Sequence, residues 1–136
     1  MTTTVVMLAK EPVPGRVKTR LQARFTPQQA ARLATAAVAD TAAAIRELPV
    51  RPVLAYDGRP GTWQPRDFHP VRQIPGDLSH RIEAALHACL CDLPEMSGSS
   101  QVLLVGMDTP QLGPALREVS WDGADAVLGL TEDGGY

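Results

Sequence analysis

The chain has 136 residues, of which 44% are hydrophobic, 21% charged and 4% aromatic, and its formal net charge is -2. This length and composition suit one soluble domain, residues 1–136, with a core of aliphatic side chains. A mildly acidic chain is not typical of general nucleic-acid binders, and its apolar runs are too short to cross a bilayer, so we expect neither nucleic acids nor membranes as partners.

The chain start and the cysteines bear on cellular location. The first residues, MTTTVVMLAKEP, lack the basic region and long apolar run of a secretory signal, so we expect a cytoplasmic protein. Cys89 and Cys91 are two positions apart. That spacing puts them on different faces of a helix, which suits neither a disulfide nor a shared metal. We expect reduced thiols.

The first half of the chain predicts a strand, a loop and a long helix. Residues 2–9 are short, apolar and β-branched, as in a buried parallel strand. A loop rich in cations follows. Residues 26–48 predict a helix in which Thr26 caps, Pro27 suits the first turn and Gln29 completes a capping box. Its apolar stripe comprises Ala34, Val38, Thr41, Ile45 and Leu48.

The rest of the chain predicts four further strands and two helices. The strands are expected at 51–58, 71–74, 101–108 and 124–130, and the helices at 79–93, opened by Ser79, and 112–120. The resulting order, β-α-β-β-α-β-α-β, predicts an α/β fold with a largely parallel sheet covered on both faces. In such sheets ligands bind beyond the carboxyl ends of the strands.

The loop after the first strand, within AKEPVPGRVKTRL, carries four cations: Lys10, Arg16, Lys18 and Arg20. It is not a Walker A loop, because Lys18 follows a valine, and it lacks the three glycines of a dinucleotide fingerprint. Its prolines reduce the entropy lost on binding, Gly15 permits close backbone approach, and the cations can contact a diphosphate. The alternative is a solvated loop whose charges only keep the protein soluble.

Carboxylates follow the last two predicted strands. Asp108 comes after a buried strand that ends in glycine, and Asp133 lies in TEDGGY after the final strand. Two carboxylates facing the cationic loop can hold one Mg²⁺ or Mn²⁺ on a substrate diphosphate. The alternative is structural, with Asp108 capping the next helix and Asp133 starting a turn.

A third polar cluster lies in QIPGDLSHRI, where Asp77 occupies a turn and Arg81 the helix that follows. The alternative here is a helix cap with a solvated arginine. The histidines show no metal-binding spacing, and no G-x-S-x-G elbow occurs.

Four ordered motifs, AKEPVPGRVKTRL, GDLSHRI, VLLVGMDTPQL and DGGY, resemble those of the glycosyltransferase-A-like family known as radical-SAM/selenodomain-associated transferases. The resemblance implies the nucleotide-diphospho-sugar transferase fold, a three-layer sandwich around a mainly parallel sheet. Members normally continue past D-G-G-Y, so we expect a fold that is incomplete at its C-terminus, weak turnover, and self-association into a homo-oligomer through uncovered surfaces.

The resemblance also suggests roles for the candidate residues. Those lining the nucleotide phosphate site would be Lys10, Gly15, Arg16, Lys18 and Arg20. Asp108 would bind the metal, Mg²⁺ or Mn²⁺, and Asp133 would be a second metal or acceptor contact. Asp77 and Arg81 match the middle motif and are further nucleotide-binding candidates.

The function implied is that of a metal-dependent transferase that uses a nucleotide sugar or a nucleoside triphosphate as donor. Asp108 and Lys18 are the catalytic candidates, because a metal and loop cations would stabilise charge on the leaving diphosphate. Two alternatives stay open: a nucleotidyltransferase of the guanylyltransferase type, and a non-catalytic nucleotide-binding module.

Overall fold

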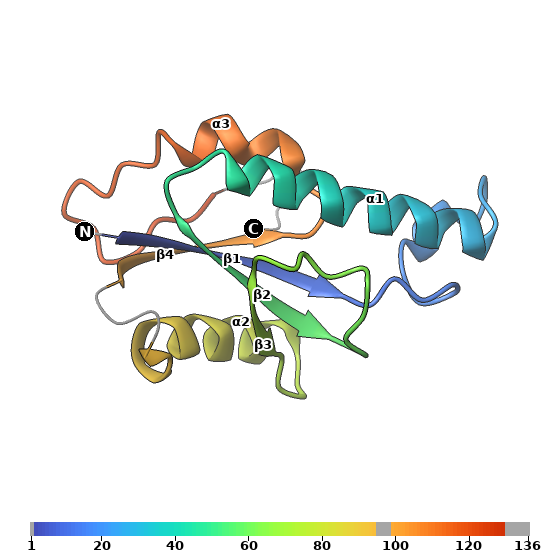
Figure 1. The fold of residues 1–136 in the computed structure, drawn as a ribbon, viewed down its shortest axis with the longest axis horizontal. Helices are drawn as coiled ribbons and strands as arrows, with labels where there is room; N and C mark the ends of the chain where they lie inside the picture. Colours follow the sequence, from blue (N-terminus) through green and yellow to red (C-terminus); the bar gives the residue numbers. More distant parts are fainter. Residues whose placement is uncertain (1, 95–98, 130–136) are drawn as a thin grey trace.

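The computed structural model describes residues 2–94 and 99–129. Four parallel strands form its sheet: β1 (Thr2–Lys10), β2 (Arg51–Asp57), β3 (His69–Arg72) and β4 (Ser99–Gly106). Their order across the sheet is β3-β2-β1-β4, and the arrowheads of β1, β2 and β4 in Figure 1 point to the same end of the molecule. The α/β fold with a parallel sheet is confirmed.

The long helix α1 (Pro27–Arg46) begins where its sequence signals predict. Thr26 Oγ1 accepts a hydrogen bond from the Gln29 N–H at 3.1 Å, and Gln29 Oε1 accepts one from the Thr26 N–H at 2.9 Å. This reciprocal capping box satisfies two main-chain donors at the exposed end of the helix. The predicted apolar stripe is buried along its whole length.

Shorter helical segments complete the fold. The helix α2 (Leu78–His87) continues into a π-helical turn, η2 (Ala88–Asp92). Two 3-10 turns, η1 (Thr19–Leu21) and η4 (Pro110–Leu112), follow β1 and β4, and η4 leads into α3 (Gly113–Leu116). The π-helical turn brings His87 Nδ1 within 3.0 Å of Asp92 Oδ2, a pairing five residues apart that a regular α-helix does not favour.

The core has two halves because side chains alternate across the strands. Val5 and Met7 of β1 face α1, packing with Val38 and Ile45, whereas Val6 faces the opposite layer, with Ala85 and Cys89 of α2 and η2 among its neighbours. Figure 1 shows α1 and α3 on one side of the sheet and α2 on the other. The domain is therefore a three-layer sandwich, as predicted.

Several predicted elements differ in the structure. Residues 124–129 do not form the strand predicted at 124–130: Val127 and Leu128 are 51% and 64% exposed, with no paired strand beside them. Apolar sequence becomes a strand only where a neighbour accepts its backbone hydrogen bonds. Helix α2 is not opened by Ser79, because Asp77 is its cap. The third strand begins and ends two residues earlier than predicted.

The strand order reverses direction at β1. From β1 the chain moves outward through β2 to β3, and it then returns to the other side of β1 as β4. In open α/β sheets this reversal leaves a crevice beyond the carboxyl ends of the two strands that flank it, and ligands bind there. The cationic loop follows β1, and Asp108 follows β4.

Candidate functional site

The carboxyl ends of β1 and β4 are joined by an ion pair between the cationic loop and the acidic motif. Lys18 Nζ lies 2.9 Å from Asp108 Oδ2, although the two residues are 90 positions apart in the chain. Their side chains are 25% and 49% exposed. The structure thus brings together the two catalytic candidates at the reversal of strand order, on a surface that a solute can reach.

The loop presents Lys18 because its neighbour Val17 is an anchor. Val17 is 1% exposed and packs against Ala31 and Ala34 of α1. Lys18 has a left-handed backbone conformation, with φ of 49°, and Gly15 has φ of 82° with open space where a Cβ would lie. A buried valine between two left-handed positions turns the loop, so that the cation beside the anchor faces β4.

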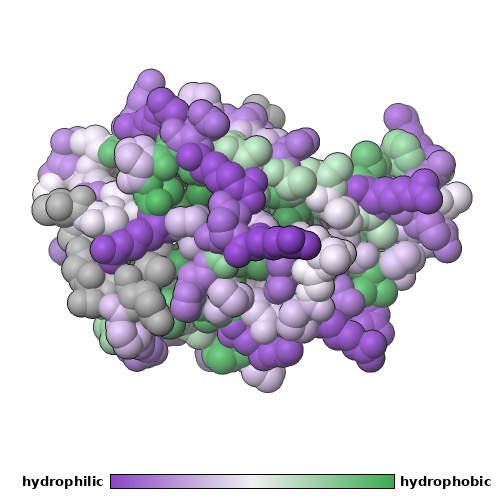
Figure 2. All heavy atoms as spheres, in the orientation of Figure 1, coloured by the Kyte–Doolittle hydropathy of each residue, from purple (hydrophilic) through white to green (hydrophobic). Residues whose placement is uncertain are grey.

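The other predicted cations lie on the same segment and face solvent. Lys10 ends β1 and is exposed, as are Arg16 and Arg20, and none of the three has an ion-pair partner among the described residues. In Figure 2 the end of the molecule formed by this loop and the start of α1 carries hydrophilic side chains beside apolar ones. Lys18 is thus accompanied by three exposed cations that have no ion-pair partner among the described residues and can contact an anionic ligand.

A hydrogen bond from α1 holds the backbone next to Asp108. The buried Thr41 donates a hydrogen bond from Oγ1 to the carbonyl of Met107 at 3.1 Å. The structure does not support the alternative in which Asp108 caps the next helix, because η4 begins from Thr109 without a side-chain cap. A Cβ on Gly106 would lie 3.6 Å from Asp108 Oδ1, an ordinary contact, so the glycine leaves the approach to that oxygen open.

A second polar cluster occupies the carboxyl ends of β1, β2 and β3. The Gln73 side-chain amide donates two hydrogen bonds, to the carbonyls of Ala9 at 2.9 Å and Ala55 at 2.8 Å. Its Oε1 accepts one from Arg81 NH1 at 3.3 Å, and the same nitrogen lies 3.8 Å from Asp57 Oδ2. Gln73 was missed by the sequence analysis, since a glutamine bonded to main-chain carbonyls leaves no pattern.

Asp77 has a structural role in the described residues. Its Oδ1 accepts a hydrogen bond from the His80 N–H at 2.9 Å and lies 3.0 Å from His80 Nδ1. These contacts, the main-chain bond first, hold the pKa of Asp77 below its usual range. The alternative interpretation, a helix cap, describes Asp77 in this structure. Arg81, by contrast, is not a solvated arginine, because it is held by Gln73.

Glu11, the acid of the cationic loop, ties that loop to β2. Its N–H donates to the carbonyl of Asp57 at 2.8 Å, and its Oε2 accepts from the N–H of Arg59 at 2.8 Å. Gly58 lies against it with φ of 98°, and a Cβ there would be 2.6 Å from Glu11 Cβ. Two features of the sequence are related to this contact: Glu11 is the one acid among the loop cations, and Asp57 is followed by glycine. Neither feature alone predicts that Glu11 bonds to Asp57 and Arg59.

The metal prediction stays untested. Among the described residues no group of three or more histidine, cysteine, aspartate or glutamate side chains could hold a metal. Asp133 lies outside the described residues. A single accessible carboxylate, Asp108, fits a Mg²⁺ or Mn²⁺ ion that arrives with a diphosphate, because such ions take one or two protein carboxylates and complete their shell with phosphate and water. A resident metal site would need more protein ligands.

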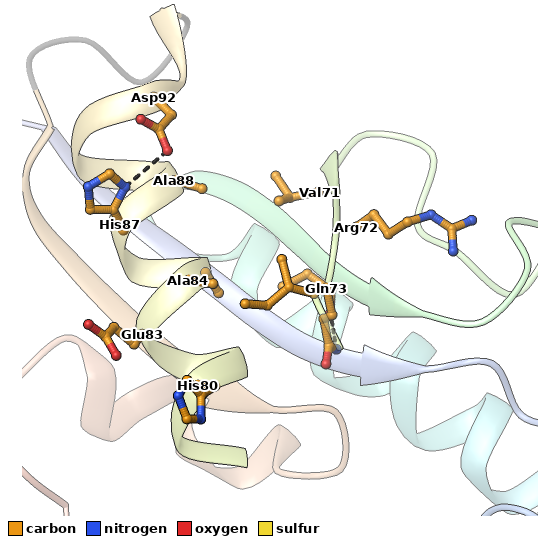
Figure 3. Close-up of a pocket in the computed structure, with 12 residues that line it drawn as sticks. Val71, Arg72, Gln73, His80, Glu83, Ala84, His87, Ala88 and Asp92 are labelled. Carbon is orange, nitrogen blue, oxygen red and sulfur yellow. Dashed lines mark hydrogen bonds and ion pairs between the residues drawn. The ribbon is translucent and has the colours of Figure 1, made fainter. Parts of the chain in front are cut away.

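Two surface hollows lie away from the ion pair. One, of about 420 Å³, lies between α2 and β3, where small side chains such as Ala84 and Ala88 face Val71 and leave the space open (Figure 3). The other, of about 580 Å³, lies between Pro12, Pro14 and the outer face of α1. Neither of these two hollows is lined by Lys18 or Asp108.

Comparison with known proteins gives a family and a fold. A family model described as "Uncharacterized protein conserved in bacteria (DUF2064)" matches residues 29–136. No curated protein matches the chain. A crystal structure from Desulfovibrio desulfuricans G20, provisionally assigned as a nucleotide-diphospho-sugar transferase, is similar with a TM-score of 0.74 and 24% sequence identity.

That similarity covers 87% of this chain and 53% of the other, so the chain spans about half the length of the structure it matches. At this identity the likeness establishes the fold, which is the one that the sequence motifs implied. Among the described residues no helix has the length and apolar character needed to span a membrane. The family match extends over most of the sequence, and the chain belongs to the bacterial family DUF2064.

Proposed function

We propose that this chain carries the donor site of a metal-dependent transferase that uses a nucleotide sugar or a nucleoside triphosphate. The observation that carries the proposal is the 2.9 Å pair of Lys18 and Asp108 at the strand-order reversal, the place where open α/β sheets bind ligands. The fold shared with a nucleotide-diphospho-sugar transferase, so assigned provisionally, supports the same class of ligand.

In this proposal Asp108 holds Mg²⁺ or Mn²⁺ on the donor diphosphate, and Asp133 is a further candidate ligand. The metal supplies Lewis-acid stabilisation of charge on the diphosphate. Lys18, released from Asp108, donates hydrogen bonds to phosphate oxygens, and Arg16 and Arg20 bind others with their planar guanidinium groups. Lys10 and the open backbone at Gly15 complete the phosphate contacts. Together these donors would stabilise the negative charge that develops on the leaving diphosphate.

Two other functions are separated from this one by experiment. A guanylyltransferase-type enzyme would transfer the nucleotidyl rather than the glycosyl group. A non-catalytic nucleotide-binding module is favoured by one observation, that the described residues contain no group of three or more side chains able to hold a metal. We propose a cytoplasmic location for all three.

The test is a thermal-shift titration with GTP and with UDP-sugars, each with and without Mn²⁺. Stabilisation that needs the metal supports the enzyme, whereas equal stabilisation without metal supports the binding module. Mass spectrometry of the products formed with each donor then tells glycosyl transfer from nucleotidyl transfer. No stabilisation by any nucleotide in either condition would overturn the proposed function.

A further inference from the structure

Arg81 is a partly buried arginine with one buried donor that has no partner among the described residues. Its side chain is 28% exposed, its Nε is buried without a hydrogen-bond partner in the described part of the chain, and its NH1 makes one long hydrogen bond of 3.3 Å, to Gln73. Asp57 Oδ2, at 3.8 Å, is too far for a hydrogen bond. A guanidinium has five N–H donors, and leaving the buried Nε donor unsatisfied is costly.

Arg46 is an arginine of this chain whose guanidinium group is paired within the protein. Its Nε and NH2 donate to the two carboxylate oxygens of Asp67 at 2.7 and 2.6 Å, in a bidentate pair. That pair is about half exposed. Arg81 is more buried and yet less satisfied, which is the arrangement expected of a group that awaits an external acceptor.

The position of Arg81 is fixed by the sheet rather than by α2 alone. Gln73, which holds its NH1, is itself bonded to the carbonyls of Ala9 on β1 and Ala55 on β2. The guanidinium therefore lies beyond the carboxyl ends of β1 to β3, whereas the Lys18–Asp108 pair lies beyond β1 and β4. Asp57 on β2 is two strands from β4, roughly 10 Å at the usual strand spacing.

The motif resemblance makes Arg81 a nucleotide-binding candidate. We propose instead that Arg81 binds an oxyanion, a phosphate or carboxylate, of the acceptor substrate, and that Gln73 is its positioning residue. The inference rests on the proposed function, in which donor phosphates occupy Lys18 and Asp108. A planar guanidinium matches such an oxyanion with two parallel hydrogen bonds. The Asp57 carboxylate opposes a bound anion, so the isolated anion binds weakly and the rest of the acceptor supplies additional affinity.

Inorganic phosphate is the probe, with binding followed by ³¹P NMR line broadening and by calorimetry. The variants below are compared in a Lys18→Met background, which weakens phosphate binding at the proposed donor site. Arg81→Met should weaken phosphate binding at least tenfold, and Gln73→Met should weaken it severalfold. Asp57→Asn should strengthen it by removing the opposing charge. Arg46→Met, which removes the satisfied arginine, is the matched control and should change it less than twofold. Arg81→Lys keeps the charge without the planar fork, and serves if the methionine variant melts much earlier than the parent protein.

Nucleotide binding measured on the same substitutions, made singly in the parent protein, distinguishes the proposed acceptor site from the proposed donor site. Arg81→Met should leave the affinity for Mn²⁺–GTP or Mn²⁺–UDP-sugar within about twofold, whereas Lys18→Met should lower it strongly. Phosphate binding that is unchanged in both Arg81 variants overturns the inference, as does a loss of nucleotide affinity in Arg81→Met equal to that in Lys18→Met. If no nucleotide binds the parent protein but phosphate binding depends on Arg81, the proposed donor site is wrong and the oxyanion site is supported.

Discussion

Replacing Asp108 by asparagine separates the role of this carboxylate in binding from its role in folding. The substitution keeps the shape of the side chain and removes its charge. The ion pair with Lys18 is partly exposed, at 25% and 49%, and pairs of that kind contribute about 0.2–1 kcal/mol to stability. We expect Asp108→Asn to lower the free energy of unfolding by no more than about 1 kcal/mol, a shift of a few degrees in Tm.

The effect on nucleotide binding should be larger and should change sign with the metal. With Mn²⁺ present, Asp108→Asn should lose the metal-dependent part of the affinity. With EDTA present, the same variant should bind nucleotide more tightly than the parent protein, because Lys18 is freed and a negative charge is removed from the phosphate site. Lys18→Met should weaken binding in both conditions, by about 1.5–3 kcal/mol, or roughly 10- to 150-fold.

Calorimetric titration with each nucleotide, in Mn²⁺ and in EDTA, checks these expectations. The titrations compare the parent protein, the two single variants and the double variant. Urea unfolding of the same proteins gives the coupling between Lys18 and Asp108 in the absence of ligand. An Asp108→Asn protein whose affinity responds to Mn²⁺ as the parent does would refute the assignment of Asp108. A coupling well above 1 kcal/mol would show that the pair is mainly structural.

Other predictions concern stability and reactivity. Gly58→Ala should destabilise the protein by about 2–4 kcal/mol in urea unfolding, because it adds a clash at 2.6 Å to a left-handed backbone, whereas Gly15→Ala, with open space around it, should cost only about 1 kcal/mol. The hydrogen bonds from Arg46 hold the pKa of Asp67 below its usual range. The contribution of ionised Asp67 to the stability of the fold is therefore present above about pH 4 and is lost as the pH falls through the lower folded-state pKa. The stability of Asp67→Asn should therefore fall below that of the parent at neutral pH and converge with it in acid; a constant difference down to low pH would contradict this. A thiol reagent such as DTNB should label the exposed Cys91 at once and Cys89 only on unfolding, since burial raises the pKa of Cys89 to about 11; rapid labelling of Cys91→Ser would show that Cys89 is accessible.

The parts of the fold set by local patterns were predictable from the sequence. The capping box at Thr26 and Gln29 needs only residues within one turn, and the buried stripe of α1 needs only a helical period. The same holds for Asp108, whose place after a strand end followed from one apolar run ending in glycine. The strand predicted at 124–130 was wrong for residues 124–129 for the opposite reason. A strand needs a neighbouring strand to pair with, and the residues of the segment do not specify that neighbour.

The contacts that assemble the candidate site are long-range and polar, and sequence patterns do not specify them. Lys18 and Asp108 were each singled out, but their pairing depends on β4 returning beside β1, an order that was not predicted. Gln73 and Glu11 act by bonding to main-chain groups of other strands. Such hydrogen bonds depend on where main-chain carbonyl and N–H groups lie. Because nearly every residue has these groups, residue type alone does not predict the bonds.

The central position of β1 gives the loop that follows it a particular role. Glu11, at the start of the loop, is hydrogen-bonded to Asp57 of β2 and to Arg59, whereas Val17, near the end of the loop, packs against α1. The segment between them therefore bridges the side of the sheet edge that holds Arg81 and the side that holds Lys18. Two prolines and a short turn limit how this bridge moves. A loop held at both ends and stiffened in this way loses less conformational entropy when a ligand binds, which favours the binding role that we propose for its cations.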